Sequence, residues 1–192
     1  MPLVKVVLSR YYLRVTTARL HQTLERLSSL FRAFLRQAAI EHGLKLVQLE
    51  ALVYLSTANR YSDTPAALTE YLGVTKGTVS QTLRALVERG LVEKVPDSKD
   101  ARVRHCRLTK AGRVIVRACY PTESLDVEVG ATVQPALEGL LRTLQRANGL
   151  RSFGVCRTCT HFEAGASGGV CGLTSERLSV RDTERLCREH EA

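Results

Sequence analysis

Residues 68–113 read LTEYLGVTKGTVSQTLRALVERGLVEKVPDSKDARVRHCRLTKAGR. The first half of this stretch predicts two short helices. Thr64 followed by Pro65 is a strong helix start, and Thr75 can cap a second helix that runs to Gly90. Apolar residues recur at helical spacing after each cap. Because only the short turn LGVT separates the two helices, they form a helix-turn-helix.

The second half of the stretch changes its period after Gly90. LVEKV and RVRHCRL alternate in the manner of strands, and the turn-rich segment PDSKDA joins them. This pattern predicts a β-hairpin, and a hairpin directly behind a helix-turn-helix is a wing. Thr109 then caps a further helix.

Helical segments flank this reader, which we define as residues 64–108. We expect a long helix from about Arg10 to His42, a second over residues 46–57 and a last one over residues 133–147. The first has a narrow apolar stripe of coiled-coil spacing, which indicates a partner helix: Leu20, Leu24, Leu27, Phe31, Phe34 and Ala38. Residues 1–150 therefore predict a mainly α fold with a small β wing and long dimerisation helices.

The net charge of +9 belongs entirely to this body. Residues 1–150 contain 22 Lys and Arg against 13 Asp and Glu, whereas residues 151–192 contain six of each. A basic surplus suits a polyanionic partner such as nucleic acid. A soluble protein that is merely basic is the alternative.

The order of long helix, helix, helix-turn-helix, wing and long helices resembles the MarR family of winged helix-turn-helix transcription regulators. The resemblance rests on residues 68–113, with the flanking helices in agreement. It implies a sequence-specific regulator that binds double-stranded DNA and is not an enzyme. The apolar stripes predict a homodimer, which would read a pseudo-palindromic operator. Relatives often bind phenolic ligands, so a small-molecule effector is a further expected partner.

The resemblance is incomplete at two positions. Thr69 stands where a helix-turn-helix usually has alanine, and Ala101 stands where many relatives have a second wing arginine.

Four polar residues lie on one side of the second reader helix, opposite its apolar face: Lys76, Thr78, Ser80 and Gln81. The major groove admits such a helix. We expect Gln81 and Thr78 to contact bases, and Lys76 and Ser80 to contact phosphates. The alternative is an ordinary solvated helix surface.

The wing contains two acids, Asp97 and Asp100, among basic residues. By resemblance, these acids orient the wing, with Asp100 holding Arg102, which would enter the minor groove. Lys99 and Arg104 would contact the DNA backbone. A solvated turn with fortuitous charges is the alternative.

Residues 151–192 form a predicted annex with four cysteines at the spacing C-x2-C-x11-C-x15-C: Cys156, Cys159, Cys171 and Cys187. We expect Cys171 in a glycine-rich loop and Cys187 late in a helix capped by Ser179. The annex has too few apolar residues to offset its chain entropy, whereas metal binding would couple to its folding. The cysteines therefore predict a metal site.

The identity of the metal is open. Four cysteines suit structural zinc, which we prefer, and also suit an iron-sulfur cluster; reactive thiols without metal are a third possibility. His161 and His190 could each replace a ligand, although a solvated or supporting role is the simpler interpretation. Cys106 and Cys119 read as small buried apolar residues, with redox sensing as the alternative.

The chain has no long apolar run and no secretory leader pattern, which predicts a soluble cytoplasmic protein without a membrane partner. A catalytic metal site would need an open position, which four cysteines do not leave. Two other functions stay open: a metal-stabilised protein-interaction module without specific DNA reading, and an iron-sulfur redox-sensing regulator.

Overall fold

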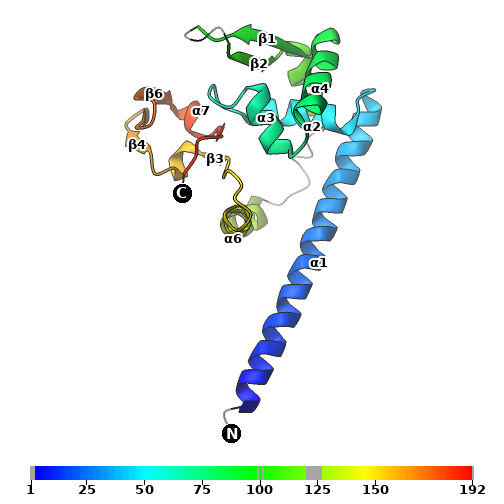
Figure 1. Ribbon diagram of the computed structural model, residues 1–192, viewed down its shortest axis with the longest axis vertical. Helices are drawn as coiled ribbons and strands as arrows, with labels where there is room; N and C mark the ends of the chain where they lie inside the picture. Colours follow the sequence, from blue (N-terminus) through cyan, green and yellow to red (C-terminus); the bar gives the residue numbers. More distant parts are fainter. Residues whose placement is uncertain (1–2, 99, 101, 120–126, 192) are drawn as a thin grey trace. The chain divides into compact units, whose positions relative to one another are not determined.

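The structure is a computed structural model that describes residues 3–98, 100, 102–119 and 127–191. The chain divides into two compact units, Met1–Leu46 and Val47–Ala192. The first contains α1 (Leu3–Glu41), the blue helix of Figure 1. This helix begins well before the expected start near Arg10, because residues 3–10 contain no glycine or proline that would end it. Several members of its predicted apolar stripe are 40–58% exposed: Leu20, Leu27, Phe31 and Phe34.

The helix-turn-helix follows α2 (Leu46–Thr57) and consists of α3 (Pro65–Leu72) and α4 (Lys76–Glu88). Both predicted caps are confirmed. The Thr64 side chain accepts a hydrogen bond from the Ala67 amide, and that of Thr75 accepts one from the Thr78 amide. Gly73 ends α3 with a φ of 63°, a left-handed conformation that glycine adopts without strain.

The core of this lobe is made by buried side chains of α2, α3, α4 and the wing: Leu49, Leu52, Tyr54, Leu68, Val79, Leu83, Leu86 and Val92. Burial of each such side chain contributes about 1.5–3 kcal/mol. Val87 is 38% exposed, unlike the buried Val79, Leu83 and Leu86 of the same helix. It lies one position beyond Leu86, and a helix turns by about 100° per residue, so it points away from the core.

The wing is confirmed as an antiparallel hairpin of β1 (Val92–Pro96) and β2 (Arg104–Leu108), with Val92 opposite Leu108. α5 (Lys110–Cys119) follows directly. A Cβ at Gly112 would lie 2.2 Å from the Leu91 carbonyl oxygen, so only glycine lets α5 approach the base of the wing this closely.

α6 (Val127–Ala147) starts earlier than the expected 133 and contains Pro135. Pro121, which we expected to interrupt the preceding helix, lies outside the described residues. Within the described part of the chain, no helix has the length and apolar character to cross a membrane.

The annex contains more β structure than we expected. β4 (Phe162–Gly165), β5 (Gly168–Cys171) and β6 (Glu176–Ser179) form an antiparallel sheet, and β3 (Gly154–Val155) pairs with β7 (Leu186–Cys187). Between β3 and β4 is the single 3-10 turn η1 (Cys156–Thr158). The glycine-rich segment that we expected as a loop forms a hairpin, in which Gly165 lies opposite Gly168.

The placement of Cys187 on a helix was wrong. Ser179 and Asp182 do form a capping box, but the helix that they start, α7 (Val180–Thr183), has only four residues. The chain then becomes extended, and Cys187 pairs with Gly154 on β3. A cap specifies where a helix begins and not where it ends, and here pairing with a distant strand replaces the helix.

Candidate functional site

The exposed face of α4 contains the polar residues singled out from the sequence. Lys76, Ser80 and Gln81 are exposed, whereas Thr78 is half-buried. The Thr78 hydroxyl lies 2.9 Å from that of Thr75, so it also takes part in the cap. Val79 on the opposite face is buried. The fold therefore presents a continuous polar surface along the first two turns of α4.

The wing holds one arginine in a defined geometry. The Asp100 carboxylate accepts hydrogen bonds from Arg102 Nε and Nη2, each at 3.0 Å, and from the Arg102 amide at 2.9 Å. These bonds lower the pKa of Asp100. Asp97 Oδ1 accepts from the Asp100 amide at 2.8 Å. The Arg102 side chain is 90% exposed, so it is oriented yet available to a ligand. Arg104 is exposed on β2, and Lys99 lies outside the described residues.

A buried histidine that the sequence did not reveal supports this wing. His105 Nδ1 lies 2.5 Å from Asp63 Oδ1, and its Nε2 lies 3.0 Å from Asp97 Oδ2. Burial alone would lower the pKa of His105, but the hydrogen bonds to the two carboxylates outweigh it and raise that pKa. The Cys106 amide also donates to the Asp63 carbonyl at 2.6 Å. Because Asp63 is 42 residues away in sequence, no local pattern could identify this pairing.

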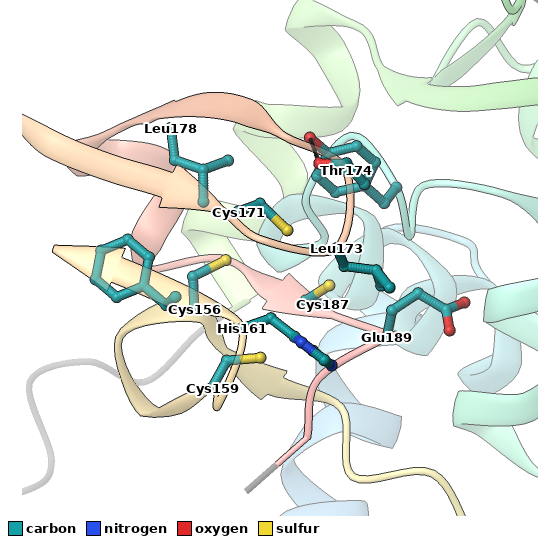
Figure 2. A pocket seen from close by; sticks show the side chains of 11 residues that line it. Cys156, Cys159, His161, Cys171, Leu173, Thr174, Leu178, Cys187 and Glu189 are labelled. Carbon is teal, nitrogen blue, oxygen red and sulfur yellow. Dashed lines mark hydrogen bonds between the residues drawn. The ribbon is translucent and has the colours of Figure 1, made fainter.

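The four annex cysteines line one cavity of about 60 Å³ (Figure 2). Cys156 lies in η1 and Cys159 directly follows it, while Cys171 ends β5 and Cys187 ends β7. Their sulfur atoms point into the same space. None of the four forms a disulfide. Burial, and after it the nearby sulfurs of Cys187, Cys171 and Cys159, raise the pKa of Cys156 to about 11. A cation is the group that would offset this crowding of sulfurs.

The side chains are not arranged as a formed metal site in this structure. Among the described residues, no group of three or more His, Cys, Asp or Glu side chains has an arrangement that could hold a metal ion. Burial raises the pKa of Cys187, and the neighbouring Asn59 side chain only partly offsets that rise. Asn59 Nδ2 is a buried donor without a hydrogen-bond partner among the described residues. The chemistry of the donors thus suits a thiolate-bound metal, although the geometry is not that of a bound ion.

The two annex histidines differ in their surroundings. His161 lines the cavity, and its Nε2 lies 3.2 Å from Glu191 Oε2. His190 is buried, and its ring nitrogens contact the hydroxyls of Ser152 at 2.7 Å and Thr158 at 3.0 Å. These contacts suit a residue that supports the C-x-x-C turn, since Thr158 lies inside that turn.

The annex packs on the helix-turn-helix lobe. Arg188 donates to both carboxylate oxygens of Glu70 on α3, each at 2.6 Å. The Phe153 ring lies edge-on to Tyr54 and Tyr71, with centroids 6.2 and 5.3 Å away. Aromatic pairs and a bidentate ion pair together form a defined interface between annex and reader.

Cys106 and Cys119 are both buried, as expected of small apolar residues. Burial raises the pKa of Cys106 to about 11. A thiol with a raised pKa contains little thiolate at neutral pH, which disfavours redox sensing at Cys106.

Comparison with known proteins agrees with this geometry. A sequence model of the MarR family matches residues 42–103. The wild-type MarR of E. coli in its apo form is 23% identical, with a TM-score of 0.50, and the match covers 64% of this chain and 96% of MarR. The transcriptional regulator PA3341 is 24% identical, with a TM-score of 0.55 and coverage of 66% and 98%. A mutant MepR from a multidrug-resistant S. aureus clinical isolate is 22% identical, with a TM-score of 0.55 and coverage of 65% and 96%.

The match to the family model covers about a third of the chain and takes in α2, α3, α4 and β1 of the winged helix. A curated relative, the HTH-type transcriptional regulator PetP of Rhodobacter capsulatus, is 43% identical over 54 residues. That match covers 28% of this chain and only 32% of PetP. The similar proteins are regulators, in agreement with the expectation that the chain is not an enzyme. About a third of this chain lies outside each structural match.

Proposed function

We propose that this chain is a sequence-specific DNA-binding transcription regulator. The observation that carries the proposal is the pairing of an exposed polar helix face with a wing arginine that Asp100 holds in place. Gln81 and Thr78 are the proposed base contacts, while Lys76 and Ser80, with Arg104 and Lys99, are the proposed phosphate contacts. The surplus of basic residues in the body supports attraction to a polyanion.

Binding to a short duplex of random sequence, measured by fluorescence anisotropy across a salt series, tests this proposal. Strong binding that falls steeply with salt supports the regulator. Absence of binding at low salt supports the rival interaction module.

Arg102→Ala should weaken this binding and reduce the salt slope by about one, because one fewer cation in the minor groove releases fewer counterions from the duplex. Arg157→Ala is the matched control, since Arg157 is an exposed annex arginine paired with Glu184. An unchanged slope in Arg102→Ala would remove this arginine from the interface.

We propose a homodimer on a pseudo-palindromic operator. The exposed stripe of α1 supports it, as does a second stripe on α6 whose members are 42–52% exposed: Val133, Leu137, Leu141 and Leu144. Two reader units would double the length of DNA that is read.

We further propose that Cys156, Cys159, Cys171 and Cys187 bind a metal, zinc in preference to an iron-sulfur cluster. The four cysteines that line one cavity support either group. Elemental analysis and a visible spectrum of anaerobically purified protein distinguish them. One zinc per colourless chain indicates a structural ion, whereas a brown protein containing iron and sulfide indicates the redox-sensing alternative. Protein without either metal would leave reactive thiols as the explanation.

A small-molecule effector is the remaining proposed partner. A cleft of about 570 Å³ lies between the annex and the lobe of α2 and α5, and it is lined by six arginines: Arg60, Arg107, Arg113, Arg117, Arg181 and Arg185. Its acids are already engaged, since Asp63 bonds to His105 and Asp182 to Ser179. An anionic effector suits this cleft better than a neutral one. Titration of DNA-bound protein with small aromatic carboxylates tests it.

A further inference from the structure

The cleft of about 570 Å³ between the annex and the lobe of α2 and α5 gathers charge of one sign. Six arginines line it against two aspartates, Asp63 and Asp182, so positive charge is in excess. Both carboxylates already have partners, which are His105 for Asp63 and Ser179 for Asp182. Like charges held together repel, so a ligand that supplies several negative charges would relieve this excess.

Two of the arginines are held in place by neutral groups. Arg113 Nη1 donates to the Leu108 carbonyl at 2.6 Å, and Arg185 Nη1 donates to the Ala58 carbonyl at 2.9 Å. A carbonyl oxygen accepts a hydrogen bond without carrying a net charge. These bonds therefore orient the guanidinium groups and leave their charge uncompensated.

Two further arginines are available to a ligand. Arg117 on α5 and Arg181 on α7 are exposed, and among the described residues neither has a hydrogen bond or an ion pair. Arg117 belongs to the lobe and Arg181 to the annex, and both line the cleft. An anion bound by both would join the annex to the lobe.

The size and lining of the cleft indicate which anion it suits. Its volume lies within the range of roughly 300–1,000 Å³ that is typical of small-molecule sites. Guanidinium groups bind phosphate oxygens through paired hydrogen bonds, and a chain of phosphates concentrates several charges in a small volume. Four buried apolar side chains also line the cleft and could cover an apolar part of the ligand: Leu55, Ala58, Leu108 and Val116.

We propose that this cleft binds a chain of condensed phosphates, carried by a nucleoside or as the free inorganic chain. Arg117 and Arg181 bind the phosphates from the lobe and from the annex. The apolar side chains serve the nucleoside and have no role for the free chain. The inference deepens the effector part of the proposed function, and it rests on that function only for any effect on DNA.

Isothermal titration calorimetry of the full chain with ATP and with sodium tripolyphosphate, at physiological ionic strength and without DNA, tests the proposal. We expect a single site on each chain. Arg117→Gln combined with Arg181→Gln should weaken the binding at least about ten-fold, because each lost guanidinium removes charge-assisted hydrogen bonds. Tighter binding of ATP assigns the site to a nucleoside polyphosphate, and equal affinities assign it to the free chain.

Arg32→Gln combined with Arg157→Gln is the matched control, because it removes the same charge at exposed positions outside the cleft. This variant should keep the wild-type affinity. The cysteines are unchanged in both double variants, so capture of a metal by the probe would affect both alike. If the cleft variant fails to fold, Arg181→Gln alone should still weaken the binding.

Absence of binding by either probe overturns the proposal, as does full affinity in the cleft variant. Lys76→Gln that weakens binding as much as the cleft variant would place the phosphates on the exposed face of α4, and this also overturns it. Citrate bound as tightly as tripolyphosphate would overturn the phosphate class and leave an anionic effector in place. Because the titration contains no DNA, a chain that binds phosphates but no duplex would contradict the proposed regulator and not the cleft.

Discussion

A single threonine starts each helix of the reader. Both helix starts were predictable from the sequence, because a capping side chain bonds to an amide only three positions further on. Thr64 and Thr75 each lie beside the amides that they cap. The same locality explains why His105 escaped prediction. Its partners Asp63 and Asp97 are 42 and 8 residues away, and a lone histidine in a strand gives no sign of either.

Thr75→Ala should destabilise the reader by about 1 kcal/mol, because the Thr78 amide loses the hydroxyl that caps it. DNA affinity should fall more than this loss of stability implies, since the frayed turn contains Lys76 and Thr78. Urea unfolding and anisotropy with a duplex measure the two effects. Thr75→Ser retains the hydroxyl and should behave as the wild type. An alanine variant with unchanged stability would show that the cap contributes nothing.

Among the elements, those with a strong local period were predicted well and those built on distant pairing were not. The wing and the reader helices fall close to their expected bounds. By contrast, β7 exists because Leu186 and Cys187 pair with Val155 and Gly154, more than thirty residues earlier. The four cysteines were predicted to converge, and they line one cavity. The docking of the annex through Arg188 and Glu70 could not be inferred, because the two residues are 118 positions apart and no local pattern links them.

The wing should lose stability as the pH rises. The ring nitrogens of His105 contact Asp63 and Asp97, and these contacts are strongest when the ring is protonated. Arg107 Nε lies 3.8 Å from the second oxygen of Asp63. Because the folded pKa of His105 is raised above its ordinary value of 6.5, the stabilisation is fully present below 6.5 and disappears as the pH passes the raised value.

To test this loss of stability, the free energy of unfolding is measured against pH for the wild type and for His105→Gln. The advantage of the wild type over His105→Gln should shrink above about pH 6.5. His21→Gln, at an exposed histidine of α1, should track the wild type at every pH. A constant difference between wild type and His105→Gln would contradict a charged His105.

At the scale of the whole molecule, the sequence predicted a partner for α1, and four members of its apolar stripe are exposed: Leu20, Leu27, Phe31 and Phe34. Exposed Phe31 and Phe34 are unfavourable in water, so a second copy that covers them would bury apolar surface at about 25 cal/mol per Å². A symmetric pairing also supplies the second reader that a pseudo-palindrome needs.

Phe34→Glu should therefore convert a dimer into a monomer, because Phe34 is 58% exposed and a charge there cannot be buried against a partner helix. Light scattering at micromolar concentration should give twice the chain mass of 21.3 kDa for the wild type and the single mass for the variant. DNA affinity should fall in parallel, since each monomer grips one half of the operator. Ser29→Glu introduces the same charge on the opposite side of the heptad and should leave the dimer intact. A wild type that scatters as a monomer would remove the dimer from the proposed function while leaving the reader and its wing unaffected.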